Sequence, residues 1–174
     1  MFDTKSNAHK SPAYRWGALT LMAALAGIII ALGFQYIGGM VPCPLCLQQR
    51  YAYYLAIPLL FLGLALLGAA EQRNASILFF LISTVFLANA GLGVYHAGAE
   101  WKFWPGPDTC AAGDMISDAT KSILERLKNT QVVRCDEAAG RFLGLSFAGW
   151  NVFLSLALCI GALQAAFAVK YKNQ

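Results

Sequence analysis

The stretch WGALTLMAALAGIIIALGFQYI, residues 16–37, contains no Asp, Glu, Lys or Arg. A helix needs about 20 predominantly apolar residues to cross a hydrocarbon layer about 30 Å thick, and this run is long enough. Three further runs share both properties, namely residues 51–70, 76–94 and 147–169. A helix satisfies its own backbone hydrogen bonds, which lipid cannot do. The sequence therefore predicts an all-α membrane protein, a four-helix transmembrane bundle.

The composition agrees with a membrane protein of one domain. Of the 174 residues, 58% are hydrophobic and 13% are charged, with a mean hydropathy of +0.54. Soluble domains carry about 25% charged residues. The net charge of +4 is small and the basic residues are scattered, which argues against nucleic-acid binding. The first apolar run is longer than the core of a cleaved signal peptide, so we expect it to remain as an anchor.

Four spans place both termini and the turn at 71–74 on one side of the membrane. The connections 38–50 and 95–146 then lie on the other side. Basic residues are denser on the side of the termini, which predicts that the termini are cytoplasmic. The basic residues on that side are Lys5, Lys10, Arg15, Arg73, Lys170 and Lys172.

Cysteine positions support the same orientation. Four of the five cysteines, Cys43, Cys46, Cys110 and Cys135, fall in the two connections on the non-cytoplasmic side. Disulfides persist in oxidising compartments such as the bacterial periplasm. Cys159 lies inside the fourth apolar run, where we expect it to pack as a small apolar residue.

The long connection contains a stretch with helical periodicity, DMISDATKSILERLKN, residues 114–129. Its apolar residues recur every three to four positions, and Asp114 is a suitable N-cap. This pattern predicts a short amphipathic helix, lying either along the bilayer surface or on the ends of the bundle. Cys110 and Cys135 flank it, and a bond between them could be a structural staple or a reactive disulfide.

The seam between the first two runs reads VPCPLCLQQRYAYY, residues 41–54. Proline is tolerated in the first turn of a helix, so the second helix is expected to begin near Pro44. Cys43 would then precede the helix and Cys46 would lie in its first turn, where unpaired N–H groups favour a thiolate. Arg50 follows Cys46 on the same helical face and adds a permanent positive charge. These features indicate a redox dithiol at the membrane surface.

Two cofactor sites that use cysteine fit this sequence poorly. A zinc site commonly has four ligands in two close pairs, and covalent haem needs a histidine directly after Cys46, where Leu47 stands. We therefore expect no metal. A purely structural disulfide at Cys43–Cys46 and an interfacial anchoring role for Arg50 remain alternatives. We expect the tyrosines that follow to belong to an interfacial belt; they are Tyr51, Tyr53 and Tyr54.

Oxidation of a dithiol releases two electrons and two protons. The sequence contains no Gly-x-Gly-x-x-Gly motif for a dinucleotide. A lipid-soluble two-electron carrier is the simplest acceptor for a dithiol at the bilayer boundary, and a quinone has that stoichiometry. The second cysteine pair could pass electrons to the first by thiol–disulfide exchange.

Together these features resemble the disulfide bond formation protein B (DsbB) family, over essentially the whole chain. The resemblance rests on the four spans, on Cys43-Pro44-Leu45-Cys46 with Arg50, and on the later cysteines with the proline-containing approach 105–110. It implies a protein of the bacterial inner membrane with periplasmic cysteine loops. Its partner would be a DsbA-type, thioredoxin-fold periplasmic oxidase, and its electron acceptor ubiquinone or menaquinone.

The resemblance also implies roles for individual residues. The reduced partner attacks a Cys110–Cys135 disulfide, forming a mixed disulfide at Cys110. Cys135 passes its electrons to Cys43, and Cys46 is released as a thiolate near the quinone and Arg50. His96 resembles a family histidine close to the quinone, although its distance from Cys110 differs by about one residue from the family pattern. An interfacial position without a redox role is the alternative for His96.

Other classes of protein share some of these features. Vitamin K epoxide reductase relatives also carry Cys-x-x-Cys in a small helical bundle, but later in the chain, so the position directly after the first span favours the DsbB resemblance. A four-span scaffold with two structural disulfides would be no enzyme at all. A transporter is disfavoured because the spans lack ionisable residues.

Overall fold

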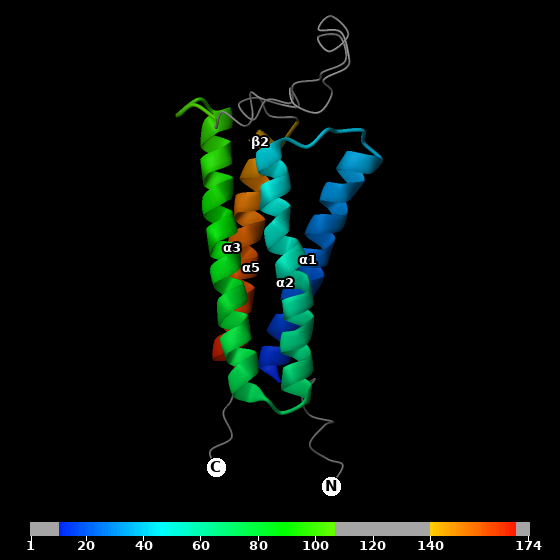
Figure 1. Cartoon of the computed structure of the whole chain (residues 1–174), viewed down its shortest axis with the longest axis vertical. Coiled ribbons are helices and arrows are strands. Elements are labelled where there is room, and N and C mark those ends of the chain that lie inside the picture. The colour runs from blue at the N-terminus through cyan, green and yellow to red at the C-terminus, as the bar shows by residue number, and fades with distance from the viewer. Residues whose placement is uncertain (1–10, 107–139, 170–174) are drawn as a thin grey trace, which may run out of the picture.

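The computed structural model describes residues 11–106 and 140–169. Four long helices run side by side in an elongated bundle (Figure 1): α1 (Pro12–Tyr36), α2 (Pro44–Gly68), α3 (Gln72–Glu100) and α5 (Phe147–Phe167). Each of these four helices is long and apolar enough to cross a membrane. The predicted all-α, four-helix membrane protein is confirmed.

The helices alternate in direction around the bundle. Neighbouring pairs are α1 with α2, α2 with α3, α3 with α5, and α5 with α1. α1 begins and α5 ends at the same end of the bundle as the α2–α3 turn (Figure 1). α2 begins and α3 ends at the opposite end, which we call the cysteine end because Cys43 and Cys46 lie there.

Three of the helices begin with a side-chain cap. The hydroxyl of Ser11 accepts a hydrogen bond from the Tyr14 N–H at 3.2 Å, with proline as the first residue of α1. Ser146 caps α5 in the same way through the N–H of Gly149.

At α2 the cap is a cysteine. The sulfur of Cys43 accepts from the Cys46 N–H at 3.2 Å, directly before Pro44. The local sequence therefore places a sulfur at the position where serine or threonine is usual.

The core is built from aromatic and branched side chains set against small ones. Phe79 of α3 is completely buried and lies between Gly17 of α1 and Gly63 of α2. A methyl group on either glycine would come within 3.0 Å of the phenyl ring. Small residues let membrane helices approach closely in this way.

Apolar side chains also cover the outside of the bundle. Ile29, Leu81 and Ile160, from three different helices, are 63%, 52% and 57% exposed. Such exposure would be unfavourable in water, whereas lipid solvates it. The bundle is therefore apolar on both its inner and its outer face.

At the cysteine end, two helices extend beyond the apolar runs that predicted them. α2 begins at Pro44, as the proline indicated, and not at residue 51 where its apolar run begins. α3 continues past residue 94 to Glu100. Backbone hydrogen bonding carries both helices past the end of their hydrophobic stretch. As a result, His96 and Glu100 lie on the last turns of α3 and not in a loop.

A short hairpin precedes α5, and sequence analysis did not predict it. Its strands, β1 (Arg141–Phe142) and β2 (Leu145–Ser146), pair antiparallel, with Arg141 opposite Ser146. The two turn residues, Leu143 and Gly144, have φ of 52° and 82°. Positive φ at both positions is typical of a type I′ turn, which favours glycine and asparagine. The amphipathic helix expected at 114–129 lies outside the described residues.

Candidate functional site

Cys43 and Cys46 lie side by side at the cysteine end. Because one is the N-cap of α2 and the other is in its first turn, the helix itself brings the two sulfurs to within 2.6 Å of each other. Both cysteines are free thiols in this structure. The sulfurs are close enough to form a disulfide without rearrangement of the backbone.

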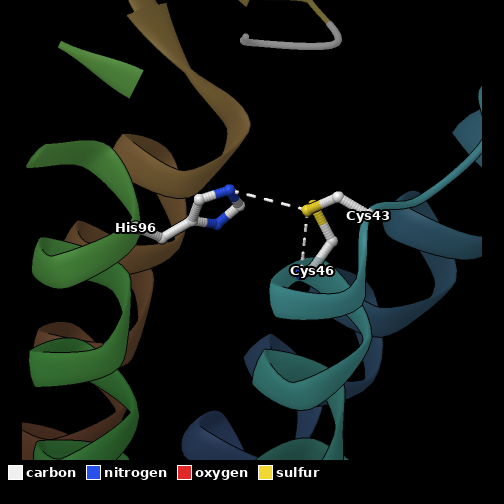
Figure 2. A group of neighbouring side chains, drawn as sticks. All are labelled: Cys43, Cys46 and His96. Atoms are coloured by element: carbon white, nitrogen blue, oxygen red, sulfur yellow. Dashed lines mark hydrogen bonds between the residues drawn. The ribbon is translucent and has the colours of Figure 1, made fainter. Parts of the chain in front are cut away.

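His96 reaches this pair from the neighbouring helix. Its Nε2 atom is 3.5 Å from the sulfur of Cys43 (Figure 2). The ring is buried, with 2% of the residue exposed. Because α3 continues beyond its apolar run, its last turns stand beside the start of α2. The structure therefore brings three of the sequence-predicted site residues together, Cys43, Cys46 and His96.

The surroundings of Cys43 favour its thiolate. The pKa of Cys43 is lowered to about 5, and the hydrogen bond with the Cys46 thiol is the largest cause. Burial acts in the opposite direction, while the hydrogen bond and electrostatic attraction of His96 and the N–H of Cys46 lower the pKa further. At pH 7 a cysteine with such a pKa is mostly ionised. Its thiolate is a nucleophile and a good leaving group.

A cavity of about 240 Å³ opens beside the thiols. Cys46, Arg50 and His96 line it together with residues of α1 and α5. The guanidinium of Arg50 donates a hydrogen bond to the side-chain carbonyl of Gln35 on α1. Arg50 and Cys46 therefore face the same space, as their spacing of one helical turn predicted.

Apolar side chains form most of the remaining wall of this cavity. Ile28, Ala31 and Phe34 come from α1, and Leu154 comes from α5. The cavity is thus polar near the thiols and apolar between α1 and α5. It could hold a molecule with a polar ring and a hydrocarbon tail.

Sequence analysis missed a group of buried and half-buried polar residues next to His96. The side-chain amide of Gln49 donates to His96 Nδ1 at 2.8 Å. Asn151 of α5 donates to the carbonyl of Gln49 at 2.6 Å, and Tyr53 donates to the carbonyl of Asn151 at 2.8 Å. Asn151 could have been noticed as a polar residue inside an apolar run. Gln49 carried no such signal, because it lies in a polar connection beside Gln48.

The expected position of Tyr53 in an interfacial belt is wrong. Its side chain is buried, with 4% exposed, because it points inward to Asn151. Tyr51 and Tyr54 are 66% and 48% exposed. The three tyrosines follow one another on a helix, so they point in different directions, and only Tyr53 faces the core.

Glu100 is a further site residue that sequence analysis did not identify. Its Oε1 atom lies 3.7 Å from His96 Nε2, one turn further along α3. Its Oε2 atom is buried without a hydrogen-bond partner among the described residues. The carboxylate of Glu100 therefore faces the same nitrogen of His96 that faces the sulfur of Cys43.

The donor atoms of Cys43, Cys46 and His96 lie within 4.8 Å of one another, which is close enough for metal binding to be considered. Two thiolates at about 2.3 Å from one tetrahedral zinc ion are roughly 3.7 Å apart. The observed sulfur separation of 2.6 Å is much shorter. The arrangement fits a redox dithiol better than a metal centre.

The remaining cysteines have different positions. Cys110 and Cys135 lie outside the described residues. Cys159 is buried between α3 and α5, with its sulfur 3.4 Å from the hydroxyl of Ser83. This packing agrees with the expectation that Cys159 has a structural role.

The family model of disulfide bond formation protein DsbB matches residues 14–165 of the chain. The chain belongs to the DsbB family. This confirms the resemblance inferred from the four spans and the cysteine motifs of the sequence. The DsbB match includes the four helices and the site at the cysteine end.

Individual DsbB proteins are similar to this chain over most of their length. The chain is 31% identical to disulfide bond formation protein B of Verminephrobacter eiseniae, covering 88% of this chain and 84% of the relative. It is 30% identical to the protein of the same name from Aromatoleum aromaticum, covering 87% of each. Disulfide bond formation protein B 1 of Pseudomonas fluorescens is 32% identical over 78% of this chain and 79% of the relative. No solved structure matches the chain.

Proposed function

We propose that this protein is a membrane thiol oxidase. It reoxidises a periplasmic dithiol oxidase of the DsbA type and transfers the electrons, through two cysteine pairs, to a membrane quinone. Membership of the DsbB family supports a role in disulfide bond formation. The quinone, the partner and the order of the cysteines are our inference.

The observation that carries this proposal is the position of the dithiol. Cys46 lines a cavity between α1, α2 and α5, while Cys43 is held against His96 at its edge. A dithiol that only braced the fold would need neither a cavity nor a buried histidine. An electron acceptor in the cavity would contact Cys46 directly, next to Cys43, whose thiolate is favoured.

The cavity is suited to ubiquinone or menaquinone as a substrate. Arg50 and His96 can donate hydrogen bonds to ring carbonyl oxygens, and Phe34 and Leu154 can contact the ring or the start of the isoprenoid tail. A quinone accepts two electrons and two protons when it is reduced to the quinol. Arg50 would stabilise negative charge on the reduced oxygen, because its guanidinium stays protonated.

The first exchange begins at the outer disulfide. A thiolate of the partner attacks Cys110 of the Cys110–Cys135 disulfide, and Cys135 leaves as a thiolate. Cys135 then attacks Cys43 of the Cys43–Cys46 disulfide, and Cys46 leaves as a thiolate beside the quinone. Each step forms one S–S bond and breaks another, so no electrons are lost or gained.

The second exchange restores the outer disulfide. The other thiol of the partner attacks its mixed disulfide and frees Cys110, and the partner leaves oxidised. Cys110 then attacks Cys135, which re-forms the Cys110–Cys135 bond and releases Cys43 as a thiolate. Cys43 and Cys46 finally form their disulfide as two electrons and two protons pass to the quinone. The net reaction converts the partner dithiol and quinone to the partner disulfide and quinol.

The proposed location follows from this reaction. We infer that the protein lies in the bacterial inner membrane, with both termini in the cytoplasm and the cysteine end at the periplasm. The denser basic residues near the termini support that orientation. The disulfides that the oxidised partner introduces into other proteins would persist only in an oxidising compartment, which is the periplasm.

The test is quinone-dependent oxidation of a reduced DsbA-type protein by the purified, full-length protein. We expect turnover with ubiquinone or menaquinone, and we expect Cys46→Ser to abolish it. Cys159→Ala is the matched control, because that thiol packs in the core, away from the cavity, and should leave turnover unchanged. A structural scaffold would show no turnover in any form.

A further inference from the structure

Four side chains form one continuous hydrogen-bonded chain at the cysteine end. Tyr53 donates to Asn151, Asn151 donates to Gln49, and Gln49 donates to Nδ1 of His96. We call Gln49 and Asn151 the amide relay. The donated hydrogen bonds all run in one direction, from α2 through α5 and back through α2 to the imidazole on α3.

Burial makes the direction of these bonds important. Gln49 and Tyr53 are each about 5% exposed or less, and His96 is 2% exposed. A buried amide has distinct donor and acceptor ends, and turning one amide over leaves two groups of the same kind facing each other. The amide relay must therefore turn as a unit or not at all.

The bond from Gln49 sets the protonation of His96. A neutral imidazole carries its proton on one nitrogen and accepts a hydrogen bond at the other. Since Gln49 donates to Nδ1, the proton is on Nε2. Nε2 faces the sulfur of Cys43 at 3.5 Å and the carboxylate of Glu100 at 3.7 Å, and both of these groups accept hydrogen bonds. If both amides were turned over, the proton would move to Nδ1. Nε2 would then face the Cys43 thiolate and the Glu100 carboxylate without a proton.

We propose that Gln49, supported by Asn151 and Tyr53, is a positioning residue that holds His96 as the tautomer protonated at Nε2, so that the ring donates its hydrogen bond to Cys43. His96 then stabilises the thiolate of Cys43 as a fixed hydrogen-bond donor and does not remove its proton as a base.

The catalytic consequence rests on the proposed function. When Cys110 attacks Cys135 of the Cys43–Cys135 disulfide, that S–S bond breaks and Cys43 takes its electron pair. The N–H of His96 already points at this sulfur, so the negative charge is stabilised as it develops. No proton has to move before Cys43 leaves.

The test is ¹⁵N NMR of histidine-labelled, reduced, full-length protein in nanodiscs, carrying His9→Asn so that His96 gives the only imidazole signal. Protonated and bare ring nitrogens differ strongly in ¹⁵N shift. We expect the native amide relay to give a bare Nδ1 and a protonated Nε2. Gln49→Glu places an acceptor at Nδ1 and should move a proton there, whereas Gln48→Glu, on the exposed neighbouring residue, should not.

Asn151→Asp provides a more remote test, because this side chain does not contact His96. A carboxylate at 151 can only accept, so Gln49 must turn its N–H toward it and present its carbonyl to Nδ1. The proton should then move from Nε2 to Nδ1 with almost no change in side-chain volume. This variant also tests the proposal if Gln49 variants fail to fold.

The results separate this inference from the proposed function. Gln49→Met should lower the turnover number roughly tenfold, the cost of one lost hydrogen bond to the site. An unchanged ¹⁵N pattern in both Gln49→Glu and Asn151→Asp would overturn the role of the amide relay. A pattern that changes as expected in a protein without quinone-dependent turnover would instead overturn the proposed function and leave the tautomer assignment standing.

Discussion

The Nε2 atom of His96 lies 3.5 Å from the sulfur of Cys43, although 53 positions separate the two residues in the sequence. The contact exists because α2 begins where α3 ends. Each of the two residues has a second hydrogen-bond partner. The Cys46 thiol lies next to Cys43, and the Gln49 amide donates to the other nitrogen of the His96 ring. A cysteine with ordinary surroundings would be a thiol at neutral pH, and this one is favoured as a thiolate.

Reduced protein should therefore show an unusual thiolate titration. The absorbance near 240 nm that is lost in Cys43→Ser should appear with a midpoint near pH 5, where the pKa of Cys43 lies, and not near the ordinary value of about 8.5. The thiolate is present above the midpoint and is protonated below it. His96→Ala removes one of the stabilising groups and should move the midpoint upward. A midpoint that stays near 8.5 in the native protein would contradict the assignment.

Arg50→Ala should weaken the use of quinone far more than it weakens folding. A hydrogen bond to a charged group is worth about 1.5–3 kcal/mol, so the quinone KM should rise roughly 10- to 100-fold. Arg73→Ala is the matched control, since Arg73 is an exposed arginine at the start of α3, at the other end of the bundle. An unchanged quinone KM in Arg50→Ala would remove the role assigned to this residue.

Cys135→Ser should trap the partner on the protein. Without Cys135 the outer disulfide cannot re-form, so reaction with an oxidised partner should accumulate a mixed disulfide at Cys110. A non-reducing gel would show it as a band at the combined mass. Cys110→Ser should give no such band, and an adduct in that variant would reverse the proposed order of the two cysteines.

Phe79→Ala should destabilise the bundle. The completely buried ring fills the space between Gly17 and Gly63, and truncation of a buried phenylalanine costs about 3–5 kcal/mol. Equilibrium unfolding in mixed micelles can measure the change. Phe80→Ala is the matched control, because Phe80 is 51% exposed on the outer face and should change the free energy of unfolding little. Equal effects of the two substitutions would contradict the packing described for α3.

The orientation of the bundle can be tested with single cysteines introduced into a cysteine-free protein. Val41→Cys lies in the α1–α2 connection at the cysteine end, and Glu71→Cys lies in the α2–α3 turn. In intact spheroplasts, a membrane-impermeant maleimide should label the first and not the second. The reverse pattern would place the dithiol in the cytoplasm and exclude the proposed exchange with a periplasmic partner.

Much of this protein is determined by local sequence. The four apolar runs predict the four helices because length and lack of charge are sufficient for a span. Pro44 predicts the start of α2 because proline is favoured in the first turn of a helix. The spacing of Cys43 and Cys46 predicts adjacent sulfurs for the same local reason. The type I′ hairpin was not predicted, because Leu143 is an unusual residue at a positive φ.

Tertiary structure decided which polar residues accompany the dithiol. Gln49 and Asn151 lie on different helices from His96, and no local pattern joins them to it. Gln49 contacts His96, and Asn151 contacts Gln49, only because α2, α3 and α5 pack together at the cysteine end. Glu100 lies beside His96 for a local reason, because it is one helical turn further along α3. In a lipid-surrounded bundle, buried polar side chains must find partners within the protein, and the helix arrangement alone determines those partners.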